Sequence, residues 1–167
     1  KNKKVFLTGH TGFKGTWLSL ILESLGAQLH GYSLKPDTKP SFFESISFDG
    51  FSTIGDIRDY DTLKKTITKF EPEIIIHMAA QPLVRLSYDD PVGTYGTNVL
   101  GLVNLLDVAK TCRSLKAILN VTSDKCYENK EWLWGYREND RLGGHDPYSN
   151  SKACAELVTN SFLKSYF

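Results

Sequence analysis

The sequence has few cysteines, little excess charge and no long run of apolar residues. Its three cysteines, Cys112, Cys126 and Cys154, are too few and too irregularly spaced for a disulfide framework or a zinc site. The longest apolar stretches are strand-length pieces such as 74–76, which excludes a membrane span. A net charge of +1 gives no electrostatic case for binding nucleic acid. These absences favour a cytoplasmic protein with reduced thiols, without a metal site and without a membrane or nucleic-acid partner.

Apolar runs alternate with longer amphipathic segments along the 167 residues, which suffice for one hydrophobic core. This alternation is typical of a parallel sheet covered by helices on both faces. The expected strands are 5–8, 28–33, 51–54, 73–78 and 115–122, and the expected helices are 13–25, 60–70, 91–112 and a last one from 147 or 148. Asp59 is the predicted N-cap of the second helix. The predicted fold class is therefore α/β.

Three glycines, Gly9, Gly12 and Gly15, lie between the first expected strand and the first expected helix. Their spacing allows a tight turn, a close approach of the backbone to a pyrophosphate, and close packing of helix on strand. The start of the helix, at Phe13 and Lys14, offers free N–H groups and a partial positive charge to phosphates. We therefore predict a Rossmann-type, doubly wound sheet that binds a dinucleotide.

The residues alone leave the kind of dinucleotide open. The acid expected about 20 residues beyond the glycines, which would hold the adenosine ribose, is missing. Ser33 can instead bond a ribose hydroxyl and Lys35 can meet a 2′-phosphate, so NAD and NADP both fit. Asp56 and Ile57, after the third expected strand, are placed to touch the adenine, although Asp56 equally suits a helix cap.

Two polar clusters lie near the end of the chain. Tyr148 and Lys152 are four residues apart and share one face of the last expected helix. The ordinary pKa of tyrosine, about 10, is too high for a base at neutral pH. A nearby ammonium stabilises the phenolate, which can then take a proton from a sugar hydroxyl. The second cluster, Ser123, Asp124 and Lys125, follows the expected strand 115–122, so it belongs at the carboxyl edge of the sheet.

Four segments resemble the extended short-chain dehydrogenase/reductase family of nucleotide-sugar epimerases and dehydratases: 8–15, 77–81, 97–101 and 148–152. Segments 121–140 and 143–152 are most similar to the dehydratase branch that acts on CDP-glucose. The resemblance implies NAD as cofactor, CDP-glucose as nucleotide-sugar substrate, and a homodimer through the helices near 91–112 and 148–167. It also implies that residues 1–167 are one NAD-binding Rossmann domain of a longer enzyme. We expect the C-terminal substrate lobe to be absent and the chain alone to be inactive or unstable.

The family's dehydratases oxidise the sugar at C4, remove water across C5 and C6, and return the hydride to C6. The resemblance assigns Tyr148 as the base for the C4 hydroxyl, Lys152 as its activating cation and nicotinamide-ribose ligand, and Ser123 as the group that orients the C4 oxygen. Asp124 stands where the family has the acid for the C6 hydroxyl, which requires a raised pKa. Lys125 stands where the family has the base for the C5 proton.

Two roles remain open for Lys125. As a base it must be neutral, which requires its ordinary pKa of about 10.4 to fall through burial or a neighbouring cation. Alternatively it stays charged and stabilises the enolate formed next to C4. An epimerase or reductase is the second hypothesis, but neither reaction needs a C6 acid or explains Asp124 and Lys125. A binding module without catalysis is the third hypothesis.

Further cofactor contacts are expected in the middle of the chain. Ala79, Ala80 and Gln81 follow the fourth expected strand and are expected to pass close to the cofactor, although ordinary packing also explains the two alanines. Asn98 either supports the lysine through water or lies on the surface of its helix.

Overall fold

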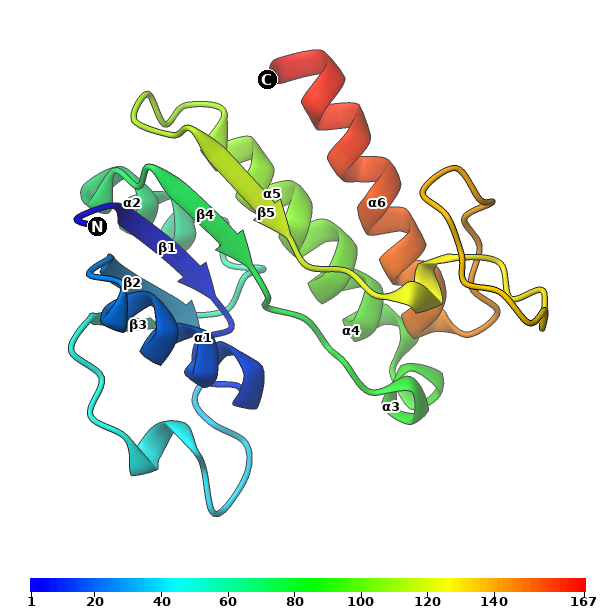
Figure 1. Ribbon diagram of the computed structural model, residues 1–167, viewed down its shortest axis with the longest axis horizontal. Helices are drawn as coiled ribbons and strands as arrows, with labels where there is room; N and C mark the ends of the chain where they lie inside the picture. Colours follow the sequence, from blue (N-terminus) through cyan, green and yellow to red (C-terminus); the bar gives the residue numbers. More distant parts are fainter.

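A five-stranded parallel sheet forms the centre of the computed structural model, which describes residues 1–167 (Figure 1). The strands are β1 (Lys4–Thr8), β2 (Gln28–Ser33), β3 (Phe51–Ile54), β4 (Ile74–His77) and β5 (Ala117–Asn120). They lie side by side in the order β3-β2-β1-β4-β5. Strands β2 and β3 are added on one side of β1, and β4 and β5 on the other. The order of the strands therefore switches between β1 and β4, where a crevice opens at the carboxyl ends of the strands. The predicted Rossmann-type sheet is confirmed.

The helices are α1 (Phe13–Ser24), α2 (Tyr60–Phe70), α3 (Val84–Asp89), α4 (Pro91–Tyr95), α5 (Gly101–Ala109) and α6 (Pro147–Tyr166). A π-helical segment, Gly96–Leu100, joins α4 to α5, and 3-10 turns occupy Phe43–Ser45 and Asp124–Cys126. The ranges of β2, β3 and α2 match the prediction. The predicted helix 91–112 is three consecutive pieces, and α3 was not predicted. None of the helices combines the length and the apolar character needed to cross a membrane.

Alternate residues of the strands pack against helices on opposite faces of the sheet. Phe6 and Ile75 face α2 and α5, where they join a buried cluster with Leu63 and Leu105. On the other face, Val5, Leu7, Leu29 and Ile76 pack against Leu18 and Leu22 of α1. The prediction of helices on both faces is therefore confirmed, although Leu119 of β5 remains 55% exposed.

The last helix, α6, lies beside α5 and β5 (Figure 1). Leu102 and Leu106 of α5 form a buried cluster with Ala155 of α6, and Ile118 of β5 packs against it. This packing brings the first turns of α6 close to the carboxyl end of β5. The two polar clusters found in the sequence, 123–125 and 148–152, therefore belong to one region of the molecule.

Candidate active site

The glycine loop leaves β1 at Thr8 and turns sharply into α1. Gly9 has φ +77°, a left-handed conformation, and a Cβ there would lie 2.9 Å from the backbone nitrogen of Ala79. A Cβ on Gly15 would lie 2.0 Å from the carbonyl oxygen of Gly9. Both positions therefore require glycine, which lets α1 and the end of β4 approach the loop closely.

Helix α1 begins without a side-chain cap. Its N-cap is Gly12 and no acid lies in its first turn, whereas Asp59 caps α2 and Asp146 caps α6 with side-chain hydrogen bonds. The backbone N–H groups at Phe13 and Lys14 are therefore available to an anion. The side chain of Phe13 is 70% exposed.

A cavity of about 240 Å³ lies at the carboxyl ends of β1 to β4, beside the glycine loop. Seven predicted cofactor residues line it: Gly9, Gly12, Ser33, Asp56, Ile57, Ala79 and Ala80. Its lining also includes residues that the sequence did not single out, among them Thr11, Asp37, Met78 and Thr97. The other predicted cofactor residues do not line it: Phe13, Lys14, Gly15, Gln81, Asn98, Tyr148 and Lys152.

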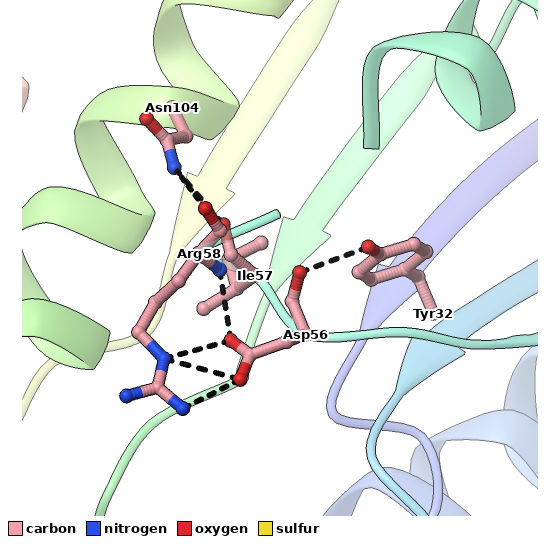
Figure 2. A network of polar contacts seen from close by, with 5 residues as sticks. All are labelled: Tyr32, Asp56, Ile57, Arg58 and Asn104. Carbon is pink, nitrogen blue, oxygen red and sulfur yellow. Dashed lines mark hydrogen bonds and ion pairs between the residues drawn. The ribbon is translucent and has the colours of Figure 1, made fainter. Parts of the chain in front are cut away.

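At one end of this cavity, Asp56 is paired with Arg58, whose guanidinium lies 2.6 Å from the carboxylate (Figure 2). The hydrogen bond from Arg58 lowers the pKa of Asp56, which keeps the group ionised. Tyr32 donates to the carbonyl oxygen of Asp56, 2.9 Å away, and the Asn104 amide lies 3.3 Å from the carbonyl oxygen of Ile57. The helix-cap alternative for Asp56 is wrong, because Asp59 caps α2.

Asn98 lies within the π-helical segment and is buried, so the helix-surface alternative is wrong. Its Oδ1 accepts from the backbone N–H of Gln81 at 2.8 Å, and its Nδ2 donates to the carbonyl of Gln81 at 3.1 Å and to Ser151 Oγ at 2.9 Å. A π-turn often marks a functional position in a helix. Here the π-turn places the side-chain amide of Asn98 between Gln81, in the segment after β4, and Ser151 of α6, so that it bonds both.

Thr8 organises the other side of the same segment. Its Oγ1 accepts from the backbone N–H groups of Met78 and Ala79, each at 3.0 Å. Its own proton therefore points to His77 Nδ1, 2.8 Å away, which assigns His77 as the neutral Nε2–H tautomer. Burial lowers the pKa of His77 to about 3, in agreement with a neutral ring. The sequence pattern gave no sign of these hydrogen bonds around Thr8.

Lys152 is buried on α6, and its ammonium donates to the carbonyl oxygen of Val121 at 3.2 Å. Burial lowers the pKa of Lys152 below its usual value. The carboxylate of Glu156, one turn further along α6, offsets only part of this shift. Thr122 donates a hydrogen bond to Glu156, and Asn120 Nδ2 donates to Thr159 Oγ1 at 2.8 Å. These hydrogen bonds connect residues 120–122 to residues 152, 156 and 159 of α6, and we call this set of residues the polar seam.

The predicted catalytic cluster follows directly after this seam. Ser123 donates to Asp124 Oδ1 at 3.1 Å and accepts from the backbone N–H of Lys125 at 3.2 Å. The side chains of Asp124 and Lys125 are exposed and line a second cavity of about 390 Å³. Tyr148 and Lys152 do not line this cavity, but their neighbour Ser149 does.

The loop between the 3-10 turn and α6 forms a wall of the second cavity. The ring of Tyr127 stacks on that of Tyr136, with centroids 5.3 Å apart, and Trp132 packs against Tyr136 at 5.7 Å. Tyr127, Tyr136 and His145 all line the cavity. In Figure 1 this loop lies beside the first turns of α6. It therefore shapes the space in front of Asp124 and Lys125.

A family model of GDP-mannose 4,6 dehydratase matches residues 6–167. The chain belongs to this family. A similar relative is CDP-glucose 4,6-dehydratase of Salmonella typhimurium, 57% identical over the whole chain and 47% of the relative. CDP-paratose 2-epimerase of Salmonella typhi is 30% identical over 98% of the chain and 54% of the relative. The chain therefore spans about half the length of these curated relatives of the dehydratase family.

Solved structures agree with this family assignment. UDP-glucose 4-epimerase from Brucella ovis, in complex with NAD, superposes with a TM-score of 0.87 at 26% identity. The match covers 98% of this chain and 49% of that protein. The likeness thus extends over the sheet, the glycine loop and α6, the parts that carry the dehydratase family's predicted site.

Proposed function

We propose that this chain is the cofactor-binding part of a cytoplasmic nucleotide-sugar 4,6-dehydratase that converts CDP-D-glucose to CDP-4-keto-6-deoxy-D-glucose. The observation that carries the proposal is the 57% identity, over the whole chain, to a CDP-glucose 4,6-dehydratase. The polar seam supports it, because it joins the predicted acid and base residues after β5 to the Tyr148–Lys152 pair of α6. Three free cysteines fit a cytoplasmic location.

The residues around the first cavity fit NAD as the cofactor. The uncapped start of α1 and the tight contact between Gly15 and Gly9 provide a backbone cradle for a pyrophosphate. Ser33, Asp56 and Ile57 line the end expected to hold the adenosine. When bound, NAD accepts a hydride from C4 of the sugar and returns it to C6, so the reaction has no net redox change.

The chain's own residues move the protons of this reaction. Tyr148, as phenolate, takes the proton of the C4 hydroxyl, and the buried ammonium of Lys152 stabilises that phenolate. Ser123 orients the C4 oxygen from the end of the seam. Asp124 protonates the departing C6 hydroxyl, which leaves as water.

Lys125 lines the second cavity together with Asp124, a position that suits both of its predicted roles. As a neutral amine at the edge of the second cavity it takes the C5 proton, and the ammonium that results stabilises the enolate formed next to C4. The acidity of C5–H comes from the adjacent C4 ketone, so a nearby positive charge lowers the barrier to its loss.

The test uses the whole protein that carries this sequence, incubated with CDP-glucose or dTDP-glucose without added reductant. We expect the alkali-induced absorbance of a 4-keto-6-deoxy sugar from CDP-glucose. The signal is expected to be lost in Tyr148→Phe and strongly reduced in Lys125→Ala, with Lys164→Ala, an exposed lysine of α6, as the matched control. A C4-inverted or reduced sugar instead would place the protein with the epimerases or reductases.

The proposed assembly is a homodimer through the helical layer of α4, α5 and α6. Support comes from exposed apolar side chains in this layer: Val92 of α4, Leu100 of the π-helical segment and Leu157 of α6 are 82%, 61% and 58% exposed. Light scattering of the whole protein should give a dimer, and Leu100→Glu with Leu157→Glu should give a monomer. Leu133→Glu, in the loop before α6, is the control that should leave the dimer intact. An unchanged mass in the double variant would contradict this interface.

A further inference from the structure

A pair of hydroxyl groups faces the adenosine end of the first cavity. Thr11 belongs to the glycine loop and Ser33 ends β2, and both are less than one-tenth exposed while lining the cavity. Their oxygen atoms, Thr11 Oγ1 and Ser33 Oγ, lie 2.8 Å apart. Thr11 Oγ1 also lies 2.9 Å from the carbonyl oxygen of Leu34. These two contacts together fix the direction of both hydroxyl protons.

The direction follows from counting donors. A carbonyl oxygen only accepts, so the single proton of Thr11 points to Leu34. The bond between the two hydroxyls must then be donated by Ser33, whose single proton points to Thr11. Ser33 Oγ is left with lone pairs only. It can accept a hydrogen bond from a group in the cavity but has no proton to give.

We propose that Thr11 is a specificity-determining positioning residue, which holds Ser33 as an acceptor and thereby selects a dinucleotide with a free ribose hydroxyl over one with a 2′-phosphate. This inference rests on the proposed function, in which the cavity holds the adenosine of the cofactor. A ribose hydroxyl can donate to Ser33. A 2′-phosphate is largely ionised near neutral pH and offers only acceptor oxygens, so it meets the lone pairs of Ser33 without a bond.

Charges around the cavity do not reverse this preference. Lys35 lines the cavity and attracts a phosphate, but its side chain is exposed, where salt and side-chain freedom weaken such an attraction. Asp37 and Asp56 line the same cavity with the opposite charge. Asp56 is already paired with Arg58, so Lys35 and Asp37 roughly balance. The hydroxyl pair is thus the feature that distinguishes the two dinucleotides.

The experiment titrates the whole protein with NAD and with NADP by calorimetry and compares the ratio of their dissociation constants. Thr11→Val keeps the shape but frees the proton of Ser33, which can then donate to a phosphate. We expect the preference for NAD to fall about tenfold, the effect of one hydrogen bond. Thr11→Ser keeps the relay and should keep the wild-type ratio.

Two further variants test that the effect passes through Ser33. Ser33→Ala should lower the preference for NAD by itself, and Thr11→Val should add nothing to it, because the two residues act as one unit. Thr16→Val makes the same change in a buried threonine that bonds the carbonyls of His10 and Gly12, not Ser33. It should weaken both dinucleotides without changing their ratio.

The outcomes separate this inference from the proposed function. The role of Thr11 is overturned if Thr11→Val leaves the ratio of the NAD and NADP dissociation constants unchanged. It is also overturned if Thr11→Val changes that ratio as much in the Ser33→Ala background as in the wild type. In both cases NAD binding stands. Should Thr11→Val fail to fold, the ratio in Ser33→Ala still decides, because an unchanged value there removes Ser33 as the acceptor. A wild-type protein that binds neither dinucleotide overturns the proposed cofactor site and this inference with it.

Discussion

The ammonium of Lys152 lies 3.2 Å from the carbonyl oxygen of Val121 and donates a hydrogen bond to it. This bond connects Lys152, one member of the predicted Tyr148–Lys152 pair, to Val121, which lies two positions before Ser123. The Thr122–Glu156 and Asn120–Thr159 bonds lie on the same seam. The two predicted catalytic segments are therefore aligned by hydrogen bonds between residues 120–122, at the end of β5, and α6.

Replacing Lys152 by methionine should move the activity of the whole protein to higher pH. Methionine keeps much of the apolar stem but removes the cation, which disfavours the phenolate that we propose as the base at Tyr148. We expect the rising limb of the pH profile of kcat/KM to shift upward by about one unit or more, with lower activity throughout. Lys152→Arg retains the charge and should shift the limb less. Equal shifts in both variants would contradict an electrostatic role for Lys152.

Thr122→Val should lower the stability of the protein by about 1–3 kcal/mol, because it leaves the carboxylate of Glu156 without its hydrogen bond beside the seam. In the Glu156→Gln background, Thr122→Val should lower the free energy of unfolding by less, because a neutral amide without a hydrogen bond is less unfavourable than a carboxylate without one. A double-mutant cycle in urea unfolding measures this difference. Additive effects would show that the two residues do not act together.

Gly15→Ala should weaken NAD binding more than about tenfold in the whole protein. The added methyl would lie 2.0 Å from the carbonyl oxygen of Gly9, a backbone atom that moves only if the loop itself moves. Gly135→Ala is the matched control, because a Cβ at that position has no neighbour within 4 Å. Calorimetric titration with NAD compares the two variants. An affinity in Gly15→Ala equal to that of the control would mean that the loop does not hold the cofactor.

Replacing Asn98 by leucine, which has a similar size, should lower the free energy of unfolding by about 2–4 kcal/mol. The change leaves the backbone N–H and carbonyl of Gln81 without these partners and removes one of the two hydrogen bonds of Ser151, which still donates to the carbonyl oxygen of Tyr148. Asn160→Leu, at an exposed position of α6, should change stability by less than about 0.5 kcal/mol. Urea unfolding of the three proteins provides the comparison. A loss of stability no larger than that of the control would show that the Asn98 bonds carry little weight.

The sequence predicted the sheet well because local chemistry and tertiary structure agree there. Helix α2 begins and ends where expected, since Asp59 accepts from Thr62 N as its cap. Helix α3 escaped prediction because it is a six-residue helix in a segment with prolines at 82 and 91. The π-helical turn around Asn98 also escaped, because an apolar period near 3.6 does not record one extra residue in a turn.

For the candidate site, the sequence supplied residue types but not their partners. The glycine loop and the Tyr148–Lys152 spacing are local patterns, so both were visible. Thr11, Glu156 and Thr8 act through residues distant in the sequence, and which partner each one meets depends on strand register and on how α6 lies against β5. The exposure of Lys125 is likewise a property of the fold.

The stability of the protein should rise with pH between about pH 5 and pH 6.5, because of a histidine in the glycine loop. His10 is fully buried, lies 2.8 Å from Ser52 Oγ through Nε2, and packs edge-on against Phe43 at 5.0 Å. Burial lowers the pKa of His10 to about 4, with a smaller contribution from His30. In this window the unfolded chain holds a proton at His10 that the folded protein does not, so folding is favoured as pH increases.

One such proton corresponds to a slope of up to about 1.4 kcal/mol per pH unit in the free energy of unfolding. His77, with a pKa lowered to about 3, adds to the slope in the same direction. His10→Gln should therefore reduce the slope by about one proton without abolishing it, whereas His145→Gln, at an exposed position, should leave it unchanged. Urea unfolding at several pH values between 5 and 6.5 measures the slopes. Equal slopes in the wild type and His10→Gln would mean that His10 is accessible to protons in the folded protein.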